Sequence, residues 1–342
     1  MNIHALAGTF DDAALVDLCE EEGLDLAIAR ALSRIGAPFR LRPFRAATPT
    51  FRDHESDELG ACRRSAVFPA FSITGGACAL DCAHCRARIL EPMIPTGDPQ
   101  AFERKARAMI EGQGMRGFLL SGGSNRRNEV PFDRYLPALR RIKDAHPRVE
   151  ILAHTGLVSR ERAGALARAG VDVAMLDIIG ARGTIEQVYN LDRPVADFEA
   201  SLENLVATGM NVVPHIVVGL HFGALLGERA ALDIIARHRT RAAIIVVVMP
   251  AFADASRFKP VDSEEAAAFF GEARARLADR EVFLGCARPP GLARRRLDHY
   301  AALAGFDGIA FPAEGVMTLI RRLGRASDHV NACCGGSCKE AA

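Results

Sequence analysis

The sequence has no long run of one charge, no apolar run of membrane-spanning length and no secretion signal. Its 342 residues carry a formal net charge of +1, so electrostatics give no reason to propose nucleic acid or an anionic membrane as a partner. Residues Met1 to Phe10 lack a basic start followed by a long apolar stretch. We therefore expect a cytoplasmic protein with small or protein-borne substrates.

Low-complexity blocks are also absent, and no repeat is visible beyond an alternation of strand and helix patterns. Hydrophobic residues make up 49% of the chain and charged residues 25%, which suits a large globular core. The nine cysteines are an odd number. In a chain of this size without a secretion signal, they indicate metal or redox chemistry more than a disulfide framework.

Eight apolar segments have the character of strands, and seven segments of helical spacing lie between them. The predicted strands are 67–73, 117–120, 149–153, 171–177, 212–218, 243–249, 282–286 and 308–311. The predicted helices are 102–112, 132–145, 160–169, 198–208, 229–238, 264–277 and 293–303, and residues 11–35 form an amphipathic segment. This alternation predicts an α/β fold with a parallel sheet, closed into a (β/α)8 TIM-type barrel. A doubly wound open sheet is the alternative, but the loop after the first strand carries cysteines in place of its usual phosphate-binding fingerprint.

The same alternation suggests how the chain is divided. We expect a helical or irregular N-terminal extension over residues 1–60 and the barrel over residues 61–325. Residues 326–342 are expected to be a cysteine-rich tail without periodicity.

Three cysteines, Cys78, Cys82 and Cys85, follow the first predicted strand at a C-x3-C-x2-C spacing. Iron–sulfur clusters prefer thiolate ligands, and short spacings let one loop reach several corners of a cube. Three ligands leave one iron of a [4Fe–4S] cluster open. The alternative is a structural zinc site with His84 or a distant residue as fourth ligand.

This motif resembles the hallmark of the radical S-adenosylmethionine (SAM) superfamily. The resemblance implies a cluster whose open iron chelates the methionyl group of SAM, and it places His84 where relatives stack a ring near the adenine. Ser121, Gly122 and Gly123 resemble the family's Gly-Gly-Glu-type motif, whose backbone binds the methionyl amine; Ser124 stands in place of the acidic residue. Taken alone, the two glycines indicate only a turn.

Polar residues at later strand ends are further candidates for SAM contacts, because catalytic groups of such barrels gather there. They are His154, Asp177, His215 and Gly219. Asp177 has a carboxylate suited to ribose hydroxyls, and residues 215–219 look like a degenerate form of the family's adenine-side pattern. Each has a structural alternative: the histidines as core residues, and Asp177 as a cap of the next helix.

The remaining cysteines suggest an auxiliary iron–sulfur cluster. Cys333, Cys334 and Cys338 form a compact tail motif around two glycines, and Cys62 and Cys286 are possible additional ligands. The alternative is a frayed tail with adventitious thiols and buried structural cysteines. Cys19 lies on an apolar helical face, which favours a core role.

From about Cys62 to Phe311 the chain resembles the biotin-synthase-like branch of the superfamily, and most of all the two-protein type of lipoyl synthase. That resemblance implies a sulfurtransferase acting on an octanoyl chain of a lipoyl-carrier protein. It also implies a second radical SAM protein as functional partner and a ferredoxin or flavodoxin as electron donor. No side chain is assigned as a catalytic acid or base. The alternatives are a carbon-skeleton or cofactor-assembly enzyme, like methylornithine synthase or the hydrogenase-maturation relatives, and a non-catalytic iron–sulfur or zinc protein.

Overall fold

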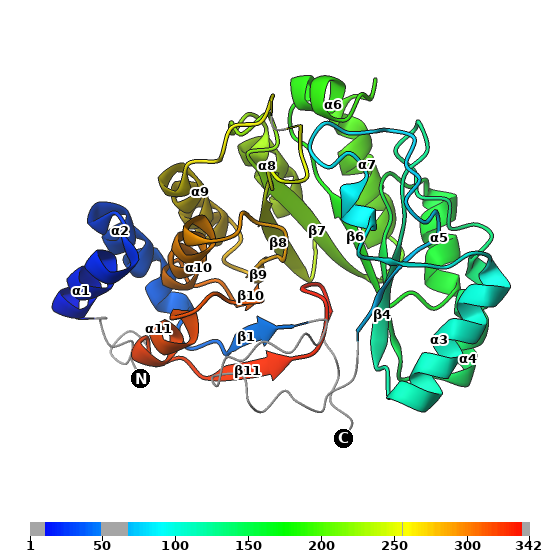
Figure 1. The fold of residues 1–342 in the computed structure, drawn as a ribbon, viewed down its shortest axis with the longest axis horizontal. Helices are drawn as coiled ribbons and strands as arrows, with labels where there is room; N and C mark the ends of the chain where they lie inside the picture. Colours follow the sequence, from blue (N-terminus) through cyan, green and yellow to red (C-terminus); the bar gives the residue numbers. More distant parts are fainter. Residues whose placement is uncertain (1–10, 49–67, 255, 337–342) are drawn as a thin grey trace.

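The computed structural model describes residues 11–48, 68–254 and 256–336. Its strands are β1 (Phe44–Ala47), β2 (Ala70–Ser72), β3 (Ile94–Pro95), β4 (Gly117–Ser121), β5 (Glu150–His154), β6 (Val173–Asp177), β7 (Asn211–Val218), β8 (Ala242–Val247), β9 (Glu281–Leu284), β10 (Gly308–Ala310) and β11 (Ser327–Val330). They form one parallel sheet in the order β11-β1-β10-β9-β8-β7-β6-β5-β4-β2-β3. The sheet curls into a half-barrel (Figure 1).

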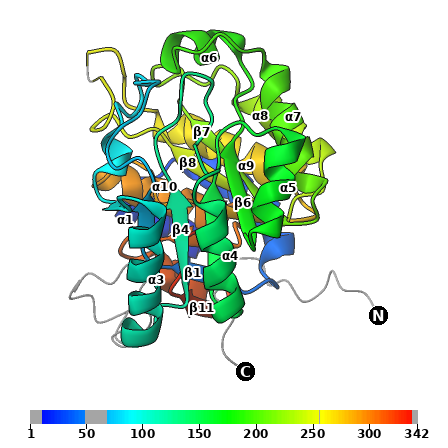
Figure 2. The ribbon, with the colours of Figure 1, turned by 90° about the vertical axis from the view of Figure 1, so that its right-hand side faces the viewer.

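The helices lie on the convex side of the curled sheet (Figures 1 and 2). They are α1 (Asp12–Glu22), α2 (Leu26–Gly36), α3 (Pro99–Gln113), α4 (Leu136–Ala145), α5 (Arg160–Arg168), α6 (Arg182–Val188), α7 (Val195–Val206), α8 (Glu228–Arg237), α9 (Ser263–Arg276), α10 (Leu292–Leu303) and α11 (Val316–Arg322). Among the described residues, no helix combines the length and the apolarity that crossing a membrane would require.

Local sequence signals explain where these helices begin and end. In α3, the Asp98 carboxylate accepts hydrogen bonds from the backbone N–H groups of Gln100 and Ala101, and Pro99 occupies the first position. The helix ends at Gly114, whose φ of 66° is left-handed. Asp262 caps α9 in the same way through two backbone N–H groups. Side chains near the helix starts therefore satisfy donors that would otherwise lack partners.

Alternation along the strands builds two apolar layers. Met175, Val213 and Ile244 belong to a cluster inside the half-barrel. Their chain neighbours Leu176 and Ile245 belong to the larger cluster between the sheet and the helices. Because successive strand residues face opposite sides, strands buried on both faces read as continuous apolar runs. This explains why β8 is buried at all six positions.

The eight predicted strands correspond to β2 and β4 to β10, so the α/β fold of the TIM-barrel kind is confirmed. The described strands do not close into a full ring by hydrogen bonds, since β11 and β3 stand at the two ends of the order. Three strands were not predicted: β1, β3 and β11. Two of these, β1 and β11, fall outside the predicted barrel range of residues 61–325, yet both belong to the sheet, because β1 pairs with β10 and with β11. The division at residues 60 and 325 stays a prediction.

The chain after β11 turns into the interior of the half-barrel. Ala332 and Cys334 are buried members of the inner cluster. A Cβ on Gly335 would lie 2.5 Å from the sulfur of Met175, which is on β6. The described part of the tail therefore fills the lumen and is not frayed.

Candidate functional site

Cys78, Cys82 and Cys85 lie in the loop that follows β2, at the carboxyl edge of the sheet. The Cys82 thiol is buried, and its sulfur lies 3.9 Å from the carbonyl oxygen of Tyr189. The Cys78 thiol donates to the carbonyl oxygen of Ser124 at 3.8 Å. The motif is thus held against the loops that follow β4 and β6, where functional groups of such sheets gather.

The surroundings of Cys85 favour its thiolate form. A hydrogen bond from the Cys82 thiol, together with the His84 ring and a backbone N–H, lowers the pKa of Cys85 to about 4 against the opposing effect of burial. The same hydrogen bond, with burial, raises the pKa of Cys82. Thiolates are the form that binds iron, so the donor set fits a cubane with three protein ligands.

The glycine pair after β4 lets two loops touch. A Cβ on Gly123 would lie 2.0 Å from the carbonyl oxygen of Ala77, and one on Gly122 would lie 2.9 Å from Ile73. The backbone N–H of Gly123 donates to the Thr74 hydroxyl at 2.7 Å. The backbone at Gly122 and Gly123 therefore packs directly on the cysteine loop, a close approach that only glycine permits.

His84 links the cysteine loop to two further polar side chains, Tyr189 and Asp177. Its ring stacks on Tyr189, with centroids 5.0 Å apart and planes at 26°. The Tyr189 hydroxyl donates to Oδ2 of Asp177 at 3.4 Å. Burial, and then the negative charge of Asp177, raise the pKa of Tyr189 well above its ordinary value, so it stays a donor. The Nδ1 atom of His84 is buried and has no hydrogen-bond partner among the residues that the structure describes, so it is available to a bound group.

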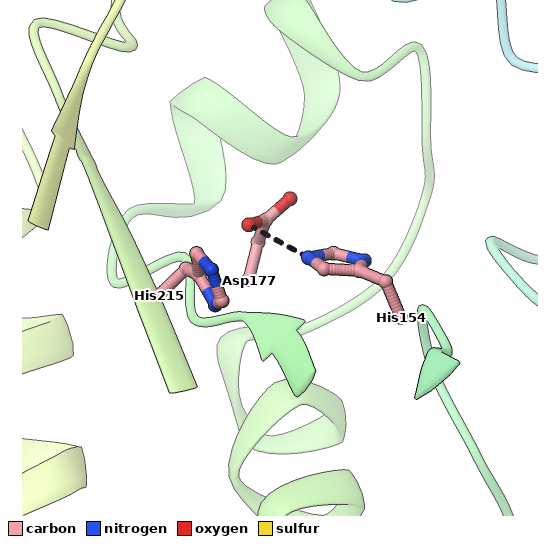
Figure 3. Close-up of side chains that lie close together, drawn as sticks. All are labelled: His154, Asp177 and His215. Atoms are coloured by element: carbon pink, nitrogen blue, oxygen red, sulfur yellow. Dashed lines mark ion pairs between the residues drawn. The ribbon is translucent and has the colours of Figure 1, made fainter. Parts of the chain in front are cut away.

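His154, Asp177 and His215 come together from three adjacent strands, β5 to β7 (Figure 3). The Nε2 atom of His154 lies 3.6 Å from Oδ1 of Asp177. Burial favours the neutral carboxyl of Asp177, but the nearby histidines outweigh it and lower its pKa. Burial, followed by the charge of His154, lowers the pKa of His215 to about 4. At neutral pH this places a carboxylate beside an uncharged imidazole.

The other predicted SAM contacts lie around the same edge. The Ser121 hydroxyl donates to the carbonyl oxygen of His154 at 3.0 Å. Gly219 has a φ of 76°, and its N–H donates to the buried carboxyl of Glu228 at 2.9 Å. Asp177 does not cap α6, because α6 begins after Ala181 without a side-chain cap.

A second group of thiols lies in the lumen. The sulfur atoms of Cys333 and Cys334 are 3.9 Å apart. A hydrogen bond from the Cys334 thiol lowers the pKa of Cys286 to about 6, and the charges of Arg288 and Arg294 act in the same direction. Hydrogen bonding with Cys286 and with Cys333, together with burial, raises the pKa of Cys334. Cys286, Cys333 and Cys334 thus converge from the end of β9 and from the tail, as a ligand set would.

Cys62 and Cys338, the other two predicted ligands, lie outside the described residues. Cys19 is buried in α1 as part of the outer apolar cluster, which agrees with the predicted core role. Sequence reasoning missed Tyr189, which contacts both His84 and Asp177. Its only distinction in the sequence is that tyrosine occurs three times in the chain.

Residues 72–223, from the end of β2 to beyond β7, match the model of the Radical SAM superfamily. These residues form a radical SAM domain. The superfamily prediction and the general function of a radical SAM enzyme are therefore confirmed, and the family implies a [4Fe–4S] cluster and SAM. No curated protein matches the sequence at a significant level.

Solved radical SAM structures share the fold. Methylornithine synthase is similar with a TM-score of 0.59 and 10% identity, and the match covers 94% of each chain. The [FeFe]-hydrogenase maturase HydG from Carboxydothermus hydrogenoformans has a TM-score of 0.57 and 13% identity, with 88% of this chain and 71% of HydG covered. At these identities, the likeness concerns the fold alone.

Proposed function

We propose that this radical SAM enzyme inserts sulfur into an octanoyl chain carried by a lipoyl-carrier protein. The observation that carries the proposal is the convergence of Cys286, Cys333 and Cys334 inside the half-barrel that bears the SAM motif at its edge. Sulfur insertion needs a sulfur source beside the radical generator. An isomerisation does not.

Residues of the cysteine loop would hold the first cofactor. Cys78, Cys82 and Cys85 provide three thiolate ligands, and the backbone at Gly122 and Gly123 lies against that loop for the methionyl amine of SAM. The cluster and SAM, when bound, supply a 5′-deoxyadenosyl radical able to take hydrogen from an unactivated C–H bond. Heterolytic removal of such a hydrogen is beyond any side-chain acid or base, which is why no acid–base residue is assigned.

The other predicted contacts have separate tasks in this proposal. His84, which stacks on Tyr189, would lie beside the bound nucleoside, and its Nδ1 atom, which has no partner among the described residues, would be free to bind it. Ser121 and Gly219 would line the edge at which SAM binds.

Cys286, Cys333 and Cys334 would hold an auxiliary iron–sulfur cluster as sulfur donor, with Cys62 and Cys338 as further candidates. The two arginines beside Cys286 favour its thiolate. Cys334 and Ala332 are buried in the inner cluster, whereas Cys286 is exposed.

The substrate and partners follow from the resemblance to two-protein lipoyl synthases through residues such as Cys286 and His215. We propose an octanoylated carrier protein as substrate, a second radical SAM protein as functional partner, and a ferredoxin or flavodoxin as electron donor. Cytoplasmic location stays a prediction.

The test is anaerobic reconstitution followed by incubation with SAM, a reductant and an octanoyl-lysyl carrier protein. We expect iron for two cubanes per chain, 5′-deoxyadenosine, and a mass gain of sulfur on the substrate. One cubane and no sulfur transfer, even with the partner protein present, would contradict the lipoyl assignment and favour the carbon-skeleton or cofactor-assembly alternative.

Single substitutions distinguish the role of the cysteine loop after β2 from the role of the cysteines in the lumen. Cys82→Ala should abolish SAM cleavage, because the first cluster loses a ligand. Cys334→Ala should keep cleavage and lose sulfur insertion. Cys19→Ala is the matched control, since Cys19 is a buried cysteine in α1 away from both groups. If Cys334→Ala still transfers sulfur, the tail is not part of the donor site.

A further inference from the structure

Strand alternation directs three polar side chains into the lumen from neighbouring strands. His154, Asp177 and His215 each lie two positions after a member of the inner apolar cluster, namely Leu152, Met175 and Val213. Residues two apart on a strand share a face, so all three side chains face the interior. The register places Asp177 directly beside His215, and His154 beside Met175.

The potential ligand atoms of these residues are close together. One ligand atom from each of the three lies within 4.8 Å of the others. The rings of His154 and His215 meet edge to face, with centroids 5.2 Å apart. Around a zinc ion with bonds of about 2.0–2.1 Å, tetrahedral ligand atoms are about 3.4 Å apart. The ligand atoms therefore need to approach one another by at most about 1.4 Å to bind one ion.

Neighbouring groups orient two of the three ligands. Nδ1 of His215 lies 3.1 Å from the carbonyl oxygen of Val213. An N–H at Nδ1 would donate there and leave the Nε2 lone pair free. Tyr189 occupies Oδ2 of Asp177, which leaves Oδ1 toward His154. Metal-binding histidines and carboxylates are commonly oriented by such hydrogen bonds.

We propose that His154, Asp177 and His215 hold one divalent transition-metal ion, at a site separate from both thiol groups. Two imidazoles and one carboxylate are a donor set for Zn2+ or Fe2+, whereas Mg2+ and Ca2+ prefer oxygen ligands. Three protein ligands leave a coordination position open for a substrate oxygen or nitrogen in the lumen.

The sequence predicts that His154, Asp177 and His215 contact SAM. A ribose diol needs the carboxylate of Asp177 and does not need two imidazoles converging on it. His215 is buried, with 7% of its surface exposed, and lies deeper in the lumen than a strand end. A metal site explains why all three side chains, His154, Asp177 and His215, converge.

The test uses the iron-reconstituted enzyme, incubated with one equivalent of Zn2+ and passed through gel filtration. We expect one zinc per chain, with only nitrogen and oxygen neighbours in X-ray absorption at the zinc edge. Sulfur neighbours would overturn the proposal, because the ion would then lie on the cysteines.

Variants complete the test. His215→Phe and Asp177→Asn should each weaken zinc retention at least tenfold while keeping the iron content and the circular dichroism of the parent. His146→Ala, at the end of α4, removes a histidine outside the lumen and should retain zinc. Unchanged zinc in folded Asp177→Asn and His215→Phe would overturn the proposal. If His215→Phe fails to fold, His215→Gln takes its place beside Asp177→Asn.

The outcome is independent of sulfur insertion, which is measured on the substrate and not on the zinc. If the parent retains no zinc and His215→Phe loses SAM binding, the three residues serve SAM and the metal proposal fails. Loss of sulfur transfer in Cys334→Ala with zinc retained would support both proposals separately.

Discussion

The guanidinium of Arg288 and the carboxylate of Asp298 form a two-point ion pair, with distances of 2.5 and 2.8 Å and both side chains fully buried. Arg288 also donates to the carbonyl oxygens of Gly285 and Phe311. The carboxylate accepts a further hydrogen bond from the backbone N–H of Ala313. This network ties the loop that carries Cys286 to the middle of α10 and to the residues that follow β10.

Removing one partner of this pair should be costly. Asp298→Asn leaves a buried guanidinium without its counter-charge, and we expect a loss of about 3–5 kcal/mol in the free energy of unfolding. Urea denaturation of the two proteins measures it. Glu272→Gln is the control, because Glu272 pairs with Arg229 on the surface and should cost less than about 1 kcal/mol. Equal losses in the two variants would contradict the role given to burial.

The close approach at Gly123 gives a second prediction. Gly123→Ala places a methyl group 2.0 Å from the carbonyl oxygen of Ala77, so the cysteine loop must shift. We expect SAM cleavage to fall at least tenfold while the thermal unfolding midpoint changes little. Gly76→Ala is the matched control, since a Cβ there meets nothing within 4 Å. If both variants cleave SAM equally well, the contact between the loops is not required.

The placement of the tail predicts thiol reactivity in iron-free protein. Cys286 is exposed, whereas Cys334 is buried among apolar side chains. Iodoacetamide should therefore modify Cys286 well before Cys334, as followed by peptide mass spectrometry. Cys19, which is also buried, should react as slowly as Cys334. Rapid modification of Cys334 alone would show that the tail leaves the lumen in solution.

Acid should weaken one link between α3 and α4. Glu103 pairs with Arg141 and Arg107, and these hydrogen bonds and charges lower its pKa below the ordinary value of 4.5. A carboxyl with a lowered folded-state pKa stabilises the fold above pH 4.5, and this contribution is lost as the pH falls through the lowered pKa. At pH 7 the free energy of unfolding of the parent should exceed that of Glu103→Gln by less than about 1 kcal/mol. Urea titrations should show that difference shrink toward pH 3; a difference independent of pH would contradict the assignment.

The central strands were predictable because burial on both faces leaves a continuous apolar record, as in residues 243–248. The edge strand β11 has the sequence SDHV and is mostly exposed, so it carries no such record. β1 has only four residues and follows an arginine-rich stretch, and its place in the sheet depends on residues more than 250 positions away. Short strands such as β1 and β11 are set by tertiary pairing more than by local pattern.

In the site, too, the residues set by local spacing were predictable, and the contacts set by the fold were not. Cys78, Cys82 and Cys85 are readable because one loop supplies all three ligands at fixed spacing. The contact of Tyr189 with His84 joins positions more than 100 residues apart, and only the fold reveals it. The pairing of Arg288 with Asp298 is equally hidden, because β9 ends at Leu284 and strand periodicity gives no guide beyond it.

The position of β1 between β10 and β11 has a consequence for folding. Residues 44–47 leave the ribosome long before residues 308–330, so their backbone donors and acceptors wait for partners while the rest of the sheet is made. Pairing across such a separation raises the contact order and slows the final step. The nascent chain must keep this short, unpaired strand from associating with other chains until residues 308–330 have been made.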